Sequence, residues 1–93
     1  GYKTSIKAVS SNTTLTDADS GKTIYWTGAA LTLPATAEVG QQFVVINNTN
    51  GAATPGLGTS NAIATNWTAH AAMADETART YICPVANKWI YIG

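Results

Sequence analysis

Short runs of alternating apolar and polar residues recur along the chain, and turn-forming residues separate them. In residues 22–27, Ile24 and Trp26 fall on one side of an extended chain, and Thr23, Tyr25 and Thr27 fall on the other. This period of two is typical of a half-buried strand. Residues 31–33 alternate in the same way, and residues 5–9 also favour a strand, with Ile6 and Val9 as the apolar residues. The first third of the chain is therefore predicted to form strands.

The most apolar segment covers residues 41–47, in which residues 43–46 are all large and hydrophobic. A continuous apolar run of this length predicts a strand that is covered on both faces. The dipeptide at residues 50–51 is Asn-Gly, a strong turn signal. Residues 52–61 are rich in glycine and predict a loop, and residues 62–68 favour a further strand.

The end of the chain predicts a β-hairpin, in which residues 80–85 and 88–92 flank a two-residue turn. Tyr81, Cys83 and Val85 share one face of the first strand. Trp89 and Tyr91 share a face of the second strand. Aromatic pairs across the two strands are expected to stabilise the hairpin.

Helical periodicity is almost absent. Thr16 or Asp17 can cap a single helical turn, and Gly21 can end it. Residues 69–79 contain helix-favouring alanines followed by polar residues, so they are predicted to be a loop with at most one helical turn. Short strands with frequent turns predict an all-β fold, a small antiparallel β-sandwich or barrel with at most one or two short helical turns.

Charge is scarce for a soluble domain. Charged residues make up 11% of the 93 residues and the formal net charge is zero, whereas an ordinary domain has about 25% charged residues. Soluble monomers normally carry more net charge than this. The composition therefore suits a protein that packs against copies of itself or against a partner. We divide the chain into an N-terminal arm or first strand, residues 1–11, and a single β domain, residues 12–93.

The same composition argues against two classes of partner. Nucleic-acid binding needs clustered basic residues, and the five Lys and Arg residues are scattered. No apolar run approaches the ~18 residues of a membrane-spanning helix. We therefore expect neither a nucleic-acid partner nor a membrane partner.

No set of residues predicts catalysis, a metal or a cofactor. Asp17, Asp19 and Gly21 match the spacing of a calcium loop only loosely, since the glycine comes one position early and the final glutamate is missing. The single histidine, His70, has no nucleophile motif to serve and too few partners for a metal site, so it is interpreted as a surface or interface residue. Cys83 is interpreted as a buried, inert thiol.

The aromatic residues leave one alternative open. Trp26, Trp67 and Trp89, with Tyr25 and Tyr91, are numerous enough to form a sugar-binding platform. Aromatic residues on strands are more often core or subunit contacts. A carbohydrate-binding module is therefore kept as a hypothesis of a different class.

A succession of short motifs resembles one known family. The motifs are residues 15–22 (Leu-Thr-Asp-Ala-Asp-Ser-Gly-Lys), 31–35 (Leu-Thr-Leu-Pro-Ala), 39–40 (Val-Gly), 43–45 (Phe-Val-Val) and 88–93 (Lys-Trp-Ile-Tyr-Ile-Gly). In this order they resemble a small β module of tailed-bacteriophage virion proteins, found in capsid decoration (cement) proteins and in the distal domains of head fibres and tail fibres. Residues 51–79 take no part in the resemblance.

The resemblance implies a non-enzymatic virion protein without cofactors, commonly a homotrimer. A decoration protein would bind the major capsid protein on the outer capsid surface, stabilise the head and be assembled in the cytoplasm of the bacterial host. The alternative is a receptor-binding distal domain of a phage tail or head fibre. In such a module, partners are expected to bind the N-terminal arm and the variable loops, which here correspond to residues 51–79. The candidate interface residues are Tyr2, Lys3, Ile6, Trp67, His70 and Met73.

Overall fold

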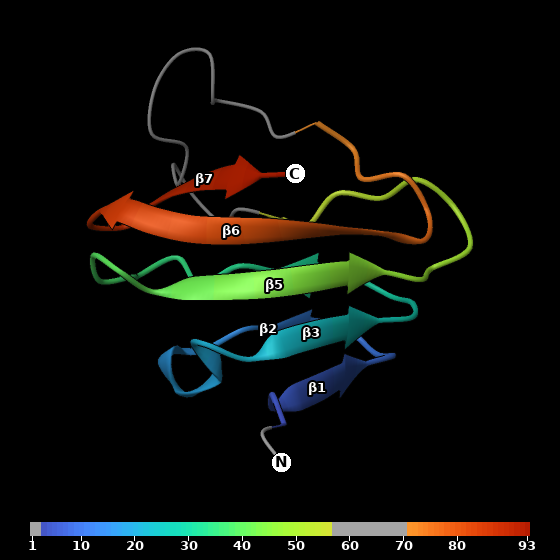
Figure 1. Ribbon diagram of the computed structural model, residues 1–93, viewed down its shortest axis with the longest axis horizontal. Coiled ribbons are helices and arrows are strands. Elements are labelled where there is room, and N and C mark those ends of the chain that lie inside the picture. The colour runs from blue at the N-terminus through green and yellow to red at the C-terminus, as the bar shows by residue number, and fades with distance from the viewer. Residues whose placement is uncertain (1–2, 57–70) are drawn as a thin grey trace.

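Two β-sheets make up the fold in the computed structural model, which describes residues 3–56 and 71–93. The larger sheet has five strands in the order β1-β3-β5-β6-β7, which run side by side in Figure 1. These strands are β1 (Ile6–Val9), β3 (Thr23–Trp26), β5 (Gln42–Asn47), β6 (Thr77–Val85) and β7 (Lys88–Ile92). The smaller sheet pairs β2 (Thr13–Thr14) with β4 (Leu31–Thr32), and a single 3-10 turn, η1, covers Asp17–Asp19.

The all-β class is confirmed, but the strand pairing is mixed, where an antiparallel arrangement was expected. β1, β3 and β5 pair in parallel, whereas β5, β6 and β7 pair antiparallel. The parallel part arises because the chain alternates between the two sheets: β1 is followed by β2, and β3 by β4. Each return to the larger sheet therefore runs in the same direction as the previous pass.

The core lies between the larger sheet and a second layer built from the smaller sheet and its neighbouring loops. Alternate side chains of the five strands point into it, as the period of two requires. The buried apolar residues of the strands of the larger sheet are Val9, Ile24, Trp26, Phe43, Val45, Tyr81, Cys83 and Trp89. The second layer contributes Leu15, Leu31, Leu33, Ala37 and Met73.

Backbone hydrogen bonds extend the second layer beyond β4. The Leu33 amide donates to the Gly56 carbonyl and the Gly56 amide donates to the Leu31 carbonyl, both at 2.7 Å. Ala53 and Met73 exchange a pair of amide–carbonyl bonds at 3.0 and 2.7 Å. In its described part, the loop predicted over residues 52–61 is thus hydrogen-bonded to the second layer. The strand predicted over residues 62–68 lies outside the described residues.

Most predicted strands form within a residue or two of the expected bounds, but β6 begins earlier. Residues 77–79 were expected to be loop, yet they pair with the end of β5 through Asn47↔Thr77 and Val45↔Arg79. Local propensity failed here because the partner strand, 30 positions earlier, decides the conformation. The predicted helical turn forms as η1, and Gly21 follows it with a φ of 85°.

The terminal hairpin confirms the predicted turn and the aromatic pair. Val85 pairs with Lys88 across the two-residue turn, and the rings of Tyr81 and Tyr91 lie 6.0 Å apart in register. Cys83 is buried, as predicted. Val85, expected on the same face, is exposed because the register shifts between Ile82 and Val85.

Candidate interaction surface

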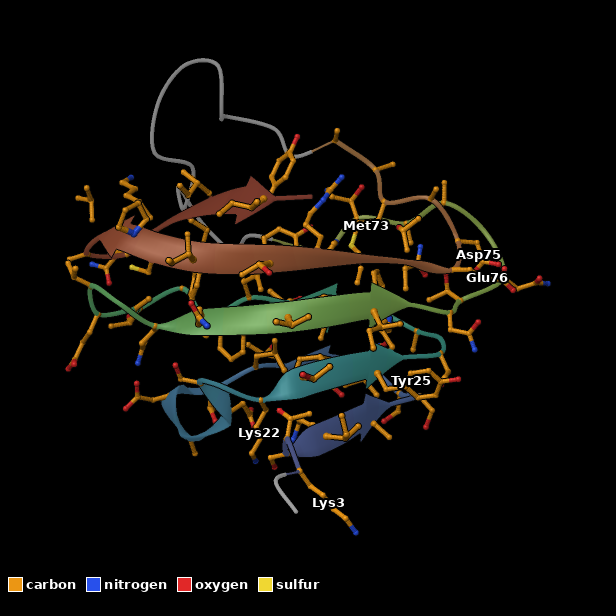
Figure 2. All side chains as sticks on the ribbon, viewed as in Figure 1. Lys3, Lys22, Tyr25, Met73, Asp75 and Glu76 are labelled. Atoms are coloured by element: carbon orange, nitrogen blue, oxygen red, sulfur yellow. The ribbon has the colours of Figure 1, made fainter. Side chains whose placement is uncertain are left out.

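One face of the larger sheet is not covered by the second layer, and we call it the open face. It consists of the outward-pointing residues of all five strands, aligned in three rows by the strand register. The rows are Ile6, Thr23, Val44, Thr80 and Ile92; then Ala8, Tyr25, Ile46 and Ala78; then Gln42, Ile82 and Ile90. Figure 2 shows Tyr25 among the side chains that project from this part of the sheet.

The open face is apolar for a surface that meets solvent. Ile6 is 56% exposed, Tyr25 39% and Ile92 63%. Val44 and Ile46 are half-buried by their neighbours in the sheet. When one face of a sheet meets solvent, the residues that point outward from it are usually polar. An apolar face left outward is the feature that marks an interaction surface on a soluble protein.

This finding corrects the expectation that β5 is covered on both faces. Phe43 and Val45 are fully buried against the second layer, whereas Val44 and Ile46 point outward into the open face. The apolar run therefore has one fully buried side and one half-buried side that belongs to the open face. The run alone does not distinguish this arrangement from a strand that is covered on both faces.

The three rows carry no charged side chain. Lys88, the first residue of β7, stands in outward register but lies at the corner of the sheet beside the hairpin turn. The other charged strand residues of the described chain are Lys7 and Arg79, both at inward positions. A contact made through this face would therefore bring no like charges together and would require little desolvation of ions.

The edge of the sheet at β1 is protected by a charge cluster. Lys7 points inward from this edge strand, and its Nζ lies 3.5 Å from Asp19 Oδ1. Lys22 Nζ lies 3.3 Å from the same oxygen. An inward-pointing charge on an edge strand disfavours pairing with another strand. Sequence reasoning did not identify this role of Lys7.

Asp19 also holds the turn that leads into β3. Its Oδ2 accepts hydrogen bonds from the Thr16 amide at 3.0 Å and the Thr16 hydroxyl at 3.2 Å. Burial by itself raises the pKa of the Asp19 carboxyl, but the Thr16 hydrogen bonds and the charges of Lys22 and Lys7 outweigh it and lower the pKa below its usual value. Asp19 is therefore a structural carboxylate, and the loose calcium-loop interpretation of this turn finds no support in its geometry.

The sheet contains a buried cation on its inner side that the sequence did not reveal. Arg79 is 8% exposed, and its guanidinium carbon lies 4.0 Å from the centre of the Tyr91 ring. Its Nη1 donates to the Ala71 carbonyl at 2.6 Å and to the Tyr81 hydroxyl at 3.3 Å. Burial raises the pKa of Tyr81, although the neighbouring Arg79 opposes this rise. Sequence reasoning placed Arg79 in a loop, so its burial was missed.

The structure distributes the six candidate interface residues unevenly. Lys3 is exposed just before β1, and Ile6 lies in the first row of the open face. Met73 is 1% exposed and packs in the core, because its backbone is paired with Ala53; it is therefore not a surface residue. The remaining three, Tyr2, Trp67 and His70, lie outside the described residues.

The aromatic platform considered for sugar binding is not assembled among the described residues. Trp26 and Trp89 are buried, and their indole Nε1 groups donate to the Ala29 and Pro34 carbonyls at 3.1 and 3.0 Å. Tyr25 is exposed on the open face. Trp67 lies outside the described residues.

Three kinds of feature are absent from the described residues. Residues 3–56 and 71–93 contain no detected cavity and no group of three or more metal-binding side chains. In the same residues, no helix has the length and hydrophobicity needed to span a bilayer. Comparison with protein-family models, with curated proteins and with solved structures found no match to this chain.

Proposed function

We propose that this chain is a non-enzymatic structural protein of a bacteriophage virion, a capsid decoration protein. In this proposal it forms a homotrimer and binds the major capsid protein on the outer surface of the head. The observation that supports it is the open face, a charge-free apolar sheet surface whose exposure suits a protein in permanent contact with others. The order of motifs that resembles phage virion modules gives the proposal its biological setting.

Binding would depend on several weak contacts acting together. An apolar face contributes free energy in proportion to the area it buries, roughly 25 cal/mol per Å². Linking three copies makes the second and third contacts intramolecular, which raises the overall affinity without stronger individual contacts. A small module with little charge is thus sufficient for stable attachment to a repetitive shell.

The N-terminal segment needs a narrower definition than residues 1–11. Val9 is 1% exposed, and β1 pairs with β3, so residues 6–9 belong to the sheet. The Ser5 carbonyl already accepts a hydrogen bond from the Thr23 amide at 2.9 Å. A truncation that tests the arm should therefore remove residues 1–4 and spare β1. In the proposal, this truncation weakens capsid binding while the sheet remains folded.

Two measurements test the proposal. Sedimentation equilibrium gives the mass of the assembly in solution, and a trimer is expected. Quantitative mass spectrometry of purified particles then gives the number of copies per virion. Hundreds of copies support decoration, whereas a few tens support the alternative, a fibre distal domain. Absence of the chain from particles would refute both assignments.

A further inference from the structure

We propose that Asn50 is a site of spontaneous deamidation, at which the side-chain amide becomes a carboxylate while the protein stays folded. The site is the bend that follows β5, where Asn50 and Gly51 are both exposed. In Figure 1 this bend lies just beyond the tip of β5. The inference stands apart from the virion assignment, because it depends only on the local chemistry of two neighbouring residues.

The reaction needs no enzyme or cofactor. The backbone nitrogen of Gly51 loses its proton to hydroxide and attacks Cγ of Asn50. A succinimide ring forms, and the side-chain nitrogen takes a proton from water and leaves as ammonia, which restores the hydroxide. Water then opens either carbonyl of the ring, so position 50 becomes aspartate or isoaspartate. The net change consumes water and releases ammonia, which raises the mass by about 1 Da.

The first requirement is an attacking nitrogen that neighbouring atoms leave accessible. Glycine has no side chain to hinder the approach of its nitrogen to Cγ of the preceding residue. Asn50 is the only asparagine in the sequence that precedes a glycine. A Cβ placed on Gly51 would meet no atom within 4 Å beyond its chain neighbours. The nitrogen of Gly51 is therefore well placed to act as the nucleophile.

The second requirement is a side-chain amide that is free to move. The asparagines of the described chain whose side chains are held by hydrogen bonds are Asn12, Asn47, Asn48 and Asn87. The side chain of Asn50 makes no hydrogen bond to another group in residues 3–56 and 71–93. Its Cγ can therefore turn toward the attacking nitrogen without losing a partner.

The third requirement is that the peptide unit between the two residues can rotate. Neither the Asn50 carbonyl nor the Gly51 amide makes a hydrogen bond within the part of the chain that the structure describes. The groups on either side are held: the Asn50 amide donates to Asp75 Oδ1 at 2.9 Å, and the Gly51 carbonyl accepts from Asn47 Nδ2 at 3.0 Å. Rotation of this unit thus breaks no hydrogen bond of the described chain, and the reaction does not require unfolding.

The products differ from the parent chain in charge and in backbone length. A new carboxylate at position 50 lies close to the Asp75 carboxylate, which the Asn50 amide contacts, and like charges at short range repel. Isoaspartate also adds one methylene to the backbone of the bend. The formal net charge of the chain is zero, so the gain of one negative charge separates the products from the parent chain on an anion-exchange column.

The test is a long incubation of the folded wild-type protein in mildly alkaline buffer at physiological temperature. Peptide mapping by mass spectrometry follows the conversion of each asparagine. We expect Asn50 to react at least tenfold faster than Asn12, which is also exposed but precedes a threonine. A parallel incubation in urea gives the rate without structure, and the rate in the folded protein is expected to lie within tenfold of it. Absence of product at Asn50, or product in urea alone, overturns the proposal.

A pair of glycine variants supports the incubation. Gly51→Ala is compatible with the fold, because Gly51 has no positive φ and the added methyl group meets open space. The methyl group hinders attack on Cγ, so the rate at Asn50 is expected to fall at least tenfold. Gly28→Ala is the matched control, since Gly28 also has no positive φ and an open Cβ position, and it should leave the rate unchanged. A Gly51→Ala rate equal to that of wild type overturns the proposed mechanism.

Discussion

The indole Nε1–H of Trp89 donates a hydrogen bond to the carbonyl oxygen of Pro34 at 3.0 Å, across 55 positions of the chain. Trp89 is fully buried, and its ring lies 5.5 Å from that of Phe43. One side chain of β7 therefore contacts both the larger sheet and the second layer. This hydrogen bond connects the β6–β7 hairpin to a segment that precedes β5.

Replacement of this indole tests how much the hydrogen bond contributes to the free energy of unfolding. Trp89→Phe keeps an aromatic ring but removes the donor, which leaves the Pro34 carbonyl buried without its partner and creates a small void. We expect the free energy of unfolding to fall by about 2–3 kcal/mol, as measured by urea denaturation. Ile92→Ala, at a position that is 63% exposed, serves as the control and should change it by less than about 1 kcal/mol. Equal urea midpoints for Trp89→Phe and wild type would show that the bond is not stabilising.

Asp19 predicts a specific dependence on acid. Its pKa is lowered in the folded protein, so its contribution to stability is complete above the unfolded pKa of about 3.9 and is lost as pH falls through the folded pKa. Asp19→Asn should therefore lower the free energy of unfolding at pH 7 by about 1 kcal/mol. Between about pH 5 and pH 2, the variant should lose less stability than wild type does.

Chemical denaturation at a series of pH values checks this expectation. Asp17→Asn removes a neighbouring, exposed carboxylate that makes no ion pair among the described residues, and it should follow the wild-type profile. Parallel profiles for Asp19→Asn and wild type would contradict the role assigned to the Asp19 carboxylate.

Ala29 offers a site for stabilisation. Its φ of 64° lies in the left-handed region, which an alanine adopts at a cost and a glycine adopts freely. We expect Ala29→Gly to raise the free energy of unfolding by about 1 kcal/mol. The neighbouring Ala30 has no positive φ, and Ala30→Gly should lower stability through the greater freedom of the unfolded chain. Thermal unfolding of both variants gives the comparison, and a destabilised Ala29→Gly would contradict it.

The open face predicts the effect of a new charge on self-association. Val44 lies in the central strand of the face, and Val44→Lys places a cation where copies would meet. We expect the dissociation constant of the assembly to rise at least tenfold while the far-ultraviolet spectrum keeps its β character. Val39→Lys is the matched control, because Val39 is 67% exposed in the turn before β5 and outside the sheet. If both variants dissociate, or if neither does, self-association does not depend on the open face.

Much of the strand content could be predicted from the sequence, because it rests on local patterns. Ile24 and Trp26 alternate with polar residues, and both are buried as that alternation requires. Gly21 ends η1 with a positive φ, as its lack of a side chain allows. These features depend on neighbours within a few residues, which a single sequence displays.

The parallel pairing could not be inferred in the same way. The pairs Ile6↔Thr23 and Thr23↔Val44 depend on how the chain crosses between two layers, and no local pattern encodes that path. The same limit applies to the candidate surface. Val44 beside Val45 gives one apolar signal whether one face or both faces are covered, so the open face became visible only with the complete sheet.

The burial of Arg79 was missed for a related reason. Arginine is rarely buried without a partner, and a basic residue after Asp75 and Glu76 is typical of a polar loop. In the structure, its environment comes from Tyr91 on the next strand and from Ala71 on the preceding segment. Long-range pairing of β6 overrode the local preference.

Pairing between segments that are distant in the sequence also limits the rate at which the larger sheet folds. In the larger sheet, β6 and β7 are joined by a two-residue turn, so their pairing closes only a short loop. The pairing of β5 with β6 closes a much longer loop, because its nearest paired residues are Asn47 and Thr77. Closing such distant segments requires a large loss of chain entropy before any pairing compensates it. We therefore expect refolding on the millisecond-to-second scale, with the β6–β7 hairpin as the earliest ordered piece and the β5–β6 pairing as the last.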